Sequence, residues 1–264
     1  MRQGISLPWR LPLQIDLNDS IGRALASQGV YDLVTTEVLW RLAAPGDHAF
    51  DIGANIGYMT SVLALRAGPG GRVDAFEPHP KTCEVLRGNV RSWSARQDCA
   101  RVQVHELALS NTQGSGSLDL VPGDEGNTGQ AFLTAQGSAS AVQVRLARLE
   151  EFLAEGRGAA ILKIDAEGHE SQVLNGAGAH LRGGRIRDIV FEETARYPAA
   201  SHRILEDAGY TIFWFEERWR GPRIIPPHQQ QGARWPYEIA PSFLGTLDPT
   251  RAKRLLSAAG WQCL

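Results

Sequence analysis

Short apolar runs alternate with segments of helical periodicity from residue 48 to residue 215, and this alternation constrains the fold more than any other feature. Strands are predicted at 48–52, 72–77, 102–109, 159–165, 186–192 and 210–215. Helices are predicted between them at 56–67, 80–93, 170–181 and 199–208. Strands that alternate with helices run parallel and are joined by right-handed crossovers. The sequence therefore predicts an α/β fold on a largely parallel sheet.

The segments outside this alternation differ in character. Residues 1–18 contain prolines and are predicted to be irregular, and Asp19 is predicted to cap a helix. Residues 110–140 are rich in Gly, Ser, Thr and Gln, which is typical of a long loop that either binds a ligand or is mobile. The last 45 residues are predicted to be rich in loops. Further elements are predicted as a helix near 31–44, strands at 116–121 and 142–146, and helices at 149–153 and 249–258.

These differences divide the chain into three parts. We expect an N-terminal helical lid over residues 1–44 and a core over residues 45–217. An extension over residues 218–264 is expected to complete the sheet and the substrate pocket.

Charge and composition exclude several classes of protein. The 264 residues hold 27 Lys and Arg against 29 Asp and Glu, so the net charge is −2 and no basic run marks a nucleic-acid partner. With 43% apolar residues the chain can bury a core, and it has no apolar run of transmembrane length. Its first residues lack a signal-peptide pattern, and three scattered cysteines fit a reduced compartment: Cys83, Cys99 and Cys263. We expect a cytoplasmic protein with no membrane or nucleic-acid partner.

A glycine-rich turn follows the first core strand. The segment Asp51-Ile52-Gly53-Ala54-Asn55-Ile56-Gly57 ends a strand and opens a helix, and its glycines permit a tight turn and the close approach of a ligand. Its spacing is neither that of a dinucleotide-binding loop nor that of a P-loop. The carboxylate before the first glycine disfavours a phosphate and favours a positively charged ligand. Because ligands bind beyond the carboxyl ends of parallel strands, this turn is a candidate binding loop.

Carboxylates end the next two strands. Glu77 can accept two hydrogen bonds from the diol of a ribose. Glu106, or the backbone of Leu107 or Ala108, is placed to meet the base of a nucleoside. With the glycine turn, these residues predict a nucleoside-binding site.

The densest cluster of chemical groups follows the fourth core strand, at residues 163–170. Lys163 and Asp165 share one face of the strand, so we expect the lysine to pair with the carboxylate. Hard oxygen ligands for Mg²⁺ are present at Asp165, Glu167, Glu192 and Glu193. No metal-ligand spacing requires an ion there, and no metal is predicted.

In their order along the chain these motifs resemble the FkbM family of S-adenosylmethionine-dependent methyltransferases. The likeness covers about residues 45–215 and rests on the segments 50–58, 71–80, 108–110, 162–170, 173–177 and 189–193. The block Lys-x-Asp-x-Glu-Gly-x-Glu at 163–170 is unusual among methyltransferases in general. The resemblance implies a Rossmann-like class I fold, with a seven-stranded, mostly parallel sheet, helices on both faces and an antiparallel last strand. It also implies S-adenosyl-L-methionine as cofactor and S-adenosyl-L-homocysteine as product.

The resemblance further implies roles for single residues. Asp51 would offset the positive charge of the cofactor, and Glu77 would hold its ribose hydroxyls. The cofactor-binding set is Asp51, Gly53, Asn55, Gly57, Tyr58, Glu77, Glu106, Ala108 and Asp165. Methyl transfer is an in-line displacement, so alignment supplies much of the rate and a base assists. The catalytic candidates are Asp165, His169 and Lys163, with Asp165 the first choice for contact with the acceptor, His169 the second, and His79 an alternative base.

Several functions remain open at this point. Family members typically methylate hydroxyl groups of sugars or polyketide-type natural products, so O-methylation of a small molecule or glycan is the leading interpretation. N-methylation needs the same fold. A non-catalytic nucleoside-binding module is disfavoured because the motif residues are all retained, and a dehydrogenase because the third glycine is missing. The aromatic residues near the C-terminus fit either a pocket wall or a homodimer contact.

Overall fold

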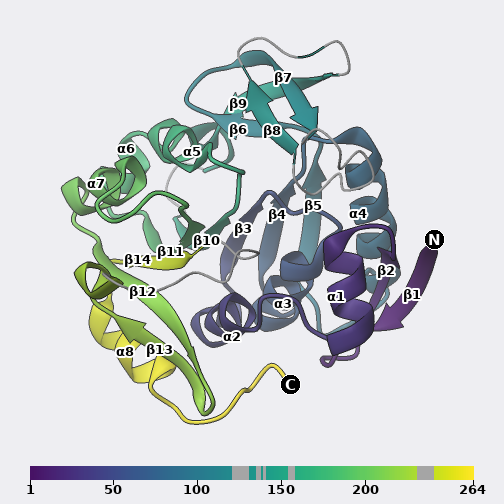
Figure 1. Ribbon diagram of the computed structural model, residues 1–264, viewed down its shortest axis with the longest axis horizontal. Helices are drawn as coiled ribbons and strands as arrows, with labels where there is room; N and C mark the ends of the chain where they lie inside the picture. The colour runs from purple at the N-terminus through teal and green to yellow at the C-terminus, as the bar shows by residue number, and fades with distance from the viewer. Residues whose placement is uncertain (121–130, 135–137, 139–140, 154–157, 231–240) are drawn as a thin grey trace.

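The structure is a computed structural model that describes residues 1–120, 131–134, 138, 141–153, 158–230 and 241–264. Figure 1 shows one large sheet with helices on both sides and a smaller sheet at the top of the view. The strands of the large sheet are, in spatial order, β13 (Gly221–Ile225), β12 (Thr211–Arg218), β14 (Ser242–Thr246), β11 (Ile186–Glu192), β10 (Ala159–Ile164), β3 (His48–Ile52), β4 (Arg72–Phe76) and β5 (Arg101–His105).

The pairing confirms the predicted α/β class. Neighbours from β5 through β4, β3 and β10 to β11 are parallel, whereas β14 runs antiparallel between β11 and β12. These strands and β12 make the seven that the class I fold implies, with the antiparallel strand last among them in the chain. A hairpin adds β13 at the edge as an eighth strand.

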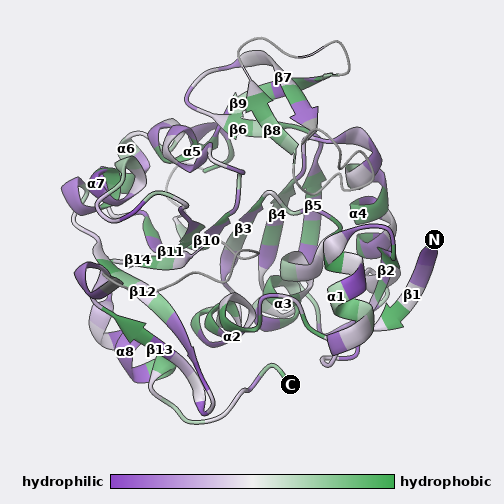
Figure 2. Ribbon diagram, viewed as in Figure 1, coloured by the Kyte–Doolittle hydropathy of each residue, from purple (hydrophilic) through white to green (hydrophobic). Residues whose placement is uncertain are grey.

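Helices cover both faces of this sheet (Figure 1). One face carries α2 (Leu33–Leu42), α3 (Tyr58–Ala67), α4 (Pro80–Trp93) and α8 (Pro249–Leu256). The other face carries α5 (Glu170–Gly176), α6 (Ala179–Arg182) and α7 (Ala200–Asp207). Consecutive strand residues alternate between the two cores, as Ala49 and Phe50 do. The central strands β10 and β11 therefore bury apolar residues on both faces (Figure 2), and they also carry the buried charged residues Lys163 and Asp188.

The prediction of an irregular N-terminus is wrong. The strands β1 (Arg2–Ser6) and β2 (Pro12–Asp16) pair as an antiparallel hairpin, and α1 (Ser20–Gln28) follows the predicted cap, where Asp19 accepts the N–H of Gly22. In β2, Leu13 and Ile15 are buried in the core, while Pro12 occupies the first position of an edge strand, where proline is tolerated. The alternation of apolar residues therefore favoured a strand here despite the prolines.

Two predicted elements are broken in the structure. The strand predicted at 102–109 divides into β5 and β6 (Ala108–Ser110), because the chain leaves the large sheet after His105 and joins the smaller one. The helix predicted at 170–181 divides into α5 and α6 at Gly178, which has a φ of +50°. A side chain at Gly176 would place Cβ 2.1 Å from the carbonyl oxygen of Ser110, so α5 packs directly on β6.

The smaller sheet occupies much of the region predicted as a long loop. Its strands are β6, β9 (Val142–Arg148), β7 (Gly114–Leu120) and β8 (Ala131–Thr134), and the short helix η2 (Leu149–Phe152) follows. The strands predicted at 116–121 and 142–146 are thus confirmed with shifted ends. Residues 121–130 of this region lie outside the described residues.

The C-terminal region is more ordered than its prolines suggested. It supplies β13, β14, the short helix η3 (Pro227–Gln230) and the predicted α8. A buried ion pair in α2, Arg41 to Glu37, fixes the final residues, because Arg41 donates to the carbonyls of Ala258 and Gly260 and Glu37 accepts the N–H of Cys263. In the part of the chain that the structure describes, no helix is long and apolar enough to span a bilayer.

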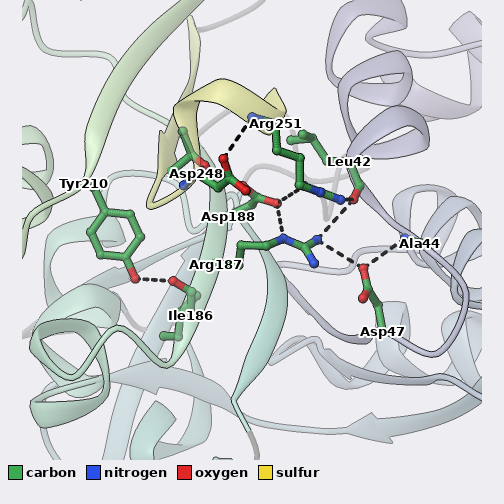
Figure 3. Close-up of polar contacts among 10 residues, drawn as sticks. Leu42, Ala44, Asp47, Ile186, Arg187, Asp188, Tyr210, Asp248 and Arg251 are labelled. Carbon is green, nitrogen blue, oxygen red and sulfur yellow. Dashed lines mark hydrogen bonds and ion pairs between the residues drawn. The ribbon is translucent and has the colours of Figure 1, made fainter. Parts of the chain in front are cut away.

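A second buried network of ion pairs lies at the amino-terminal end of the parallel strands (Figure 3). Asp188 of β11 is fully buried and accepts hydrogen bonds from Thr246 at 2.7 Å, Arg187 at 2.7 Å and Arg251 at 2.9 Å. Both guanidinium groups also donate to the carbonyl of Leu42 at the end of α2. This network ties β11, β14, α8 and α2 together at the edge opposite the carboxyl ends of the parallel strands.

Candidate functional site

A cavity of about 440 Å³ lies at the carboxyl ends of the parallel strands. The ends of β3, β4, β10 and β11 contribute Gly53, Glu77, Asp165 and Glu192 to its wall. Most of the candidate residues from distant parts of the sequence therefore meet in one place, as expected for ligand sites in open α/β sheets.

The glycine turn locks three strand ends together. Gly53 has a φ of +75°, and a Cβ there would lie 1.8 Å from the carbonyl oxygen of Asp165. The N–H groups of Gly53 and Ala54 donate to the carbonyl of Phe76, and the N–H of Asp165 donates to the carbonyl of Ile52. Only glycine fits this close approach of β3 and β10.

Lys163 bridges the same strand ends by its charge. Its Nζ donates to the carbonyl of Gly53 at 2.9 Å, and it lies 3.4 Å from Asp165 Oδ2 and 3.5 Å from Asp51 Oδ1. Burial acts to lower the pKa of Lys163, but the two carboxylates outweigh burial and raise this pKa above its usual range. Lys163 is therefore charged and links the ends of β3 and β10. Its predicted pairing with Asp165 is present.

Three predicted cofactor ligands do not line the cavity. Asp51 is fully buried beneath it, where its carboxylate accepts a hydrogen bond from Thr60 and faces Lys163. Gly57 is packed so that a Cβ would meet Leu86 at 2.7 Å. Glu106 is turned to the surface, where it pairs with Arg87 at 2.5 Å, because the chain turns outward between β5 and β6. Asp51 therefore does not contact the cavity itself and pairs with Lys163, which does.

Glu77 presents a buried carboxylate at the end of β4. Its Oε2 accepts the N–H of Asn55 at 2.9 Å and its Oε1 accepts the N–H of His79 at 2.8 Å. Burial raises the pKa of Glu77 to about 7 despite these hydrogen bonds. Each oxygen keeps a free lone pair for a further donor. Asn55 holds the left-handed conformation at φ +50°, which places its N–H against Glu77.

The far wall of the cavity is acidic. Asp165 and Glu192 lie side by side at the ends of β10 and β11, and burial together with the charge of Asp165 raises the pKa of Glu192 to about 10. Glu167 also lines this wall, from a left-handed position at φ +50° in a loop that Glu170 stabilises by accepting the N–H groups of Ala166 and Gly168. A carboxylate beside another carboxylate favours binding of a cationic group.

His169 lines the cavity and is held by Ser110 of β6. Its Nε2 lies 2.9 Å from Ser110 Oγ, and that hydroxyl donates to Asn111 Oδ1 at 3.3 Å. The hydroxyl is thus an acceptor for Nε2–H, which leaves the lone pair on Nδ1. Burial lowers the pKa of His169, so the ring is neutral at pH 7. The alternative base His79 is buried against Thr82 and does not line the cavity.

Sequence reasoning missed the residues that the N-terminal segment brings to the cavity. Tyr31, Asp32 and Thr35 line it beside the predicted Tyr58, and the hydroxyl of Thr35 donates to Ser242 of β14 at 3.0 Å. The one available signal was Asp32, which precedes an apolar periodic segment and caps α2 by accepting the N–H of Thr35. Ala108, which we also assigned to the cofactor, lines the cavity.

The acidic groups do not assemble into a metal site. Among the residues that the structure describes, no three His, Cys, Asp or Glu side chains are arranged to hold a metal ion. Glu193 accepts the N–H of Ala195 and does not line the cavity.

Comparisons with known proteins identify the family. The Methyltransferase FkbM domain model matches residues 51–212, which is more than half of the chain. The methyltransferase sdnD of Sordaria araneosa is 26% identical over 228 residues, covering 74% of this chain and 86% of that protein. The hexuronic acid methyltransferase AglP of Haloferax volcanii is 28% identical, covering 60% of both proteins. The 31-O-demethyl-FK506 methyltransferase FkbM of Streptomyces tacrolimicus is 31% identical, covering 56% of this chain and 65% of that protein. The chain therefore belongs to the FkbM methyltransferase family, whose cofactor is S-adenosylmethionine.

Proposed function

We propose that this chain is an O-methyltransferase that methylates a hydroxyl group of a sugar or of a polyketide-type natural product. The observation that carries the proposal is His169, a neutral imidazole that lines the cavity with its Nδ1 free to accept a proton. Two relatives support the acceptor class, because one is named for a hexuronic acid and another for a demethylated FK506.

The residues of the cavity fit S-adenosylmethionine. Glu77 would hold the two ribose hydroxyls on its free lone pairs. Phe76, Leu107 and Ala108 give an apolar wall for the base. Gly53 keeps the turn free of a side chain, and the backbone beside Asn55 and Tyr58 would flank the methionine part. The excess of carboxylates suits a ligand that carries an ammonium and a sulfonium group.

The chain's own residues would then align the acceptor and remove its proton. The bound cofactor supplies an electrophilic methyl group. Asp165 would hold the acceptor hydroxyl in line with that methyl group, while Lys163 keeps Asp165 in place. As the new C–O bond forms, the hydroxyl proton would pass to Nδ1 of His169, and Ser110 would hold the ring in the required tautomer. Lys163 acts here as a positioning residue.

The flanking segments would close this cavity. Ser20, Ile21 and Tyr31 of the N-terminal segment line it, which supports the assignment of residues 1–44 as a lid built from a hairpin and two helices. Pro241 and Ser242 of the C-terminal extension line it from β14, which supports a role for residues 218–264 in the acceptor pocket.

The cofactor part of the proposal is tested by calorimetry. S-adenosylmethionine and S-adenosylhomocysteine should bind the intact chain with micromolar affinity, and NAD and ATP should not. Glu77→Ala should weaken both at least tenfold, because two buried hydrogen bonds to a carboxylate are lost. Glu106→Ala is the matched control, since this carboxylate ends the next strand but faces the surface, and it should bind as the wild type does.

The acceptor part needs a second measurement. Transfer of a labelled methyl group should be detected on neutral hydroxylated acceptors, and His169→Asn should lower kcat without weakening cofactor binding. Transfer only to amines would overturn O-methylation. A folded protein that binds neither sulfur nucleoside would contradict the proposal as a whole.

A further inference from the structure

An exposed tryptophan lies at the tip of the β12–β13 hairpin. Trp219 and Arg220 form the turn between the two strands, and Trp219 is 90% exposed. In the described ranges the other large hydrophobic residues with such exposure are the terminal residues Met1 and Leu264. The hairpin reaches the lower edge of the molecule in Figure 1, and its outer half is largely hydrophilic in Figure 2.

This turn is held in place by contacts with the C-terminal residues. The carbonyl of Arg220 accepts the N–H of Gly260 at 2.8 Å, and the carbonyl of Gly260 accepts from Arg41 Nη2. A Cβ at Gly221 would lie 2.8 Å from the same carbonyl of Gly260, so the hairpin and the C-terminal residues are in direct contact. The buried pair of Arg41 and Glu37 thus supports the turn that presents the indole.

Basic residues are concentrated beside the turn that carries Trp219. Arg218, Arg220, Arg223 and Lys253 line a hollow of about 500 Å³ beside the turn. Glu216 offsets part of this charge, because it lies 2.7 Å from Arg218 and 3.8 Å from Arg223, and the exposed Glu217 adds a second carboxylate to the hairpin. Across the described residues, neither Arg220 nor Lys253 has a carboxylate within 4.0 Å, and Lys253 lies over the ring of Phe213.

Composition led us to expect no membrane partner, but from this surface we propose that Trp219 and the four basic residues around the hollow dock this protein on an anionic lipid bilayer. Tryptophan favours the headgroup level of a membrane, and basic residues next to an anionic leaflet are attracted by its surface potential. A single indole on a narrow turn matches an interface only a few ångströms deep, whereas a protein partner requires a wider buried area. The proposal is independent of the methyltransferase chemistry.

Vesicle sedimentation of the full chain tests this surface. The protein should sediment with vesicles of phosphatidylcholine and phosphatidylglycerol but not with phosphatidylcholine alone, and high salt should release it. Trp219→Ala, Arg220→Gln and Arg223→Gln should each lower the partition coefficient by about fivefold. Arg203→Gln, an exposed arginine on α7, is the matched control and should leave it unchanged.

The test distinguishes this surface from other anion-binding surfaces. Failure to sediment with anionic vesicles, or equal sedimentation of the wild type and the three hairpin variants, would overturn the proposal. Retention by a DNA duplex that needs the same residues, without vesicle binding, would assign the surface to nucleic acid instead. Unchanged melting temperatures of all variants would show that the exposed substitutions leave the fold intact.

Discussion

Buried charged groups are paired in opposite ways at the two ends of the parallel sheet. At the amino-terminal end, Asp188 is surrounded by two arginines and a threonine, and each of its oxygens has a partner (Figure 3). At the carboxyl end, carboxylates crowd around Lys163, and burial raises the pKa of Glu77 to about 7 and that of Glu192 to about 10. The first arrangement satisfies its charges within the protein, and the second leaves charge to be satisfied by a ligand.

Because of this difference, we expect the buried charges at the amino-terminal end to contribute to stability and those at the carboxyl end to contribute to binding. Removing one partner from a satisfied buried network leaves the remaining charges unpaired and destabilises the fold. Neutralising one acid in a crowded acidic wall relieves repulsion and the cost of burial. The same substitution, acid to amide, should therefore have opposite effects at the two ends.

The largest effect is expected for Asp188→Asn. The change removes a carboxylate from Arg251 and leaves Arg187 with Asp47, and it should lower the free energy of unfolding by about 3 kcal/mol or more. Urea denaturation measures the loss. The folded fraction should bind S-adenosylhomocysteine with wild-type affinity, and weakened binding there would mean that the two ends are coupled.

The next effect is a pH dependence of cofactor binding. Hydrogen bonds from ribose hydroxyls favour the ionised form of Glu77, but with a pKa of about 7 in the free protein it is mostly protonated at pH 6. Binding at pH 6 must release that proton, so S-adenosylhomocysteine should bind about tenfold more weakly at pH 6 than at pH 8. Calorimetry across this range gives the profile. Glu77→Gln should flatten it, and a tenfold slope that survives in this variant would assign the titration to another group.

A smaller effect of opposite sign is expected for Glu192→Gln. Burial and the charge of Asp165 raise the pKa of Glu192, so the folded state keeps a proton that the unfolded chain releases near the ordinary value for Glu, and wild-type stability falls as the pH rises above that ordinary value. The amide does not titrate, so the variant should be more stable than the wild type at pH 8 by about 1 kcal/mol or more. The difference should vanish near pH 4.5, and a variant less stable at pH 8 would show that Glu192 is satisfied in the fold.

The smallest effect concerns the tautomer of His169. Nitrogen-15 NMR of the imidazole should show the proton on Nε2, because Ser110 accepts it. Ser110→Ala should redistribute the proton between the two nitrogens and change stability by only about 1 kcal/mol. Ser171→Ala, on the neighbouring helix, should leave the spectrum unchanged. A wild-type ring protonated on Nδ1 would contradict the proposed base.

Much of the carboxyl end of the sheet follows from sequence because its chemistry is local. Gly53, Glu77 and Lys163 each sit at a fixed place after an apolar run, and parallel strands bring such places to one edge. Asp51 and Glu106 show the limit of this reasoning. A position at a strand end does not specify whether a side chain points into the cavity, down into the core or out to solvent, since the twist and the outgoing chain decide that.

The contacts at the amino-terminal end of the sheet could not be predicted from the sequence in the same way. Asp188 is paired with its neighbour Arg187 in β11, but its other two partners, Thr246 of β14 and Arg251 of α8, are more than 50 residues away. Tyr31 and Asp32 reach the cavity only because the hairpin of residues 2–16 and α1 fold back over the sheet. No local pattern encodes such encounters.

The sequence by itself determined the α/β class, the order of the core strands and helices, and the motif set that marks the methyltransferase family. These depend on periodicity and on turn chemistry, which act over a few residues. Tertiary structure decided which carboxylates face the cavity, which are sealed beneath it, and which pair with arginine at the far end. Those outcomes depend on burial and on charges brought together from distant segments, and such energies exist only in the folded chain.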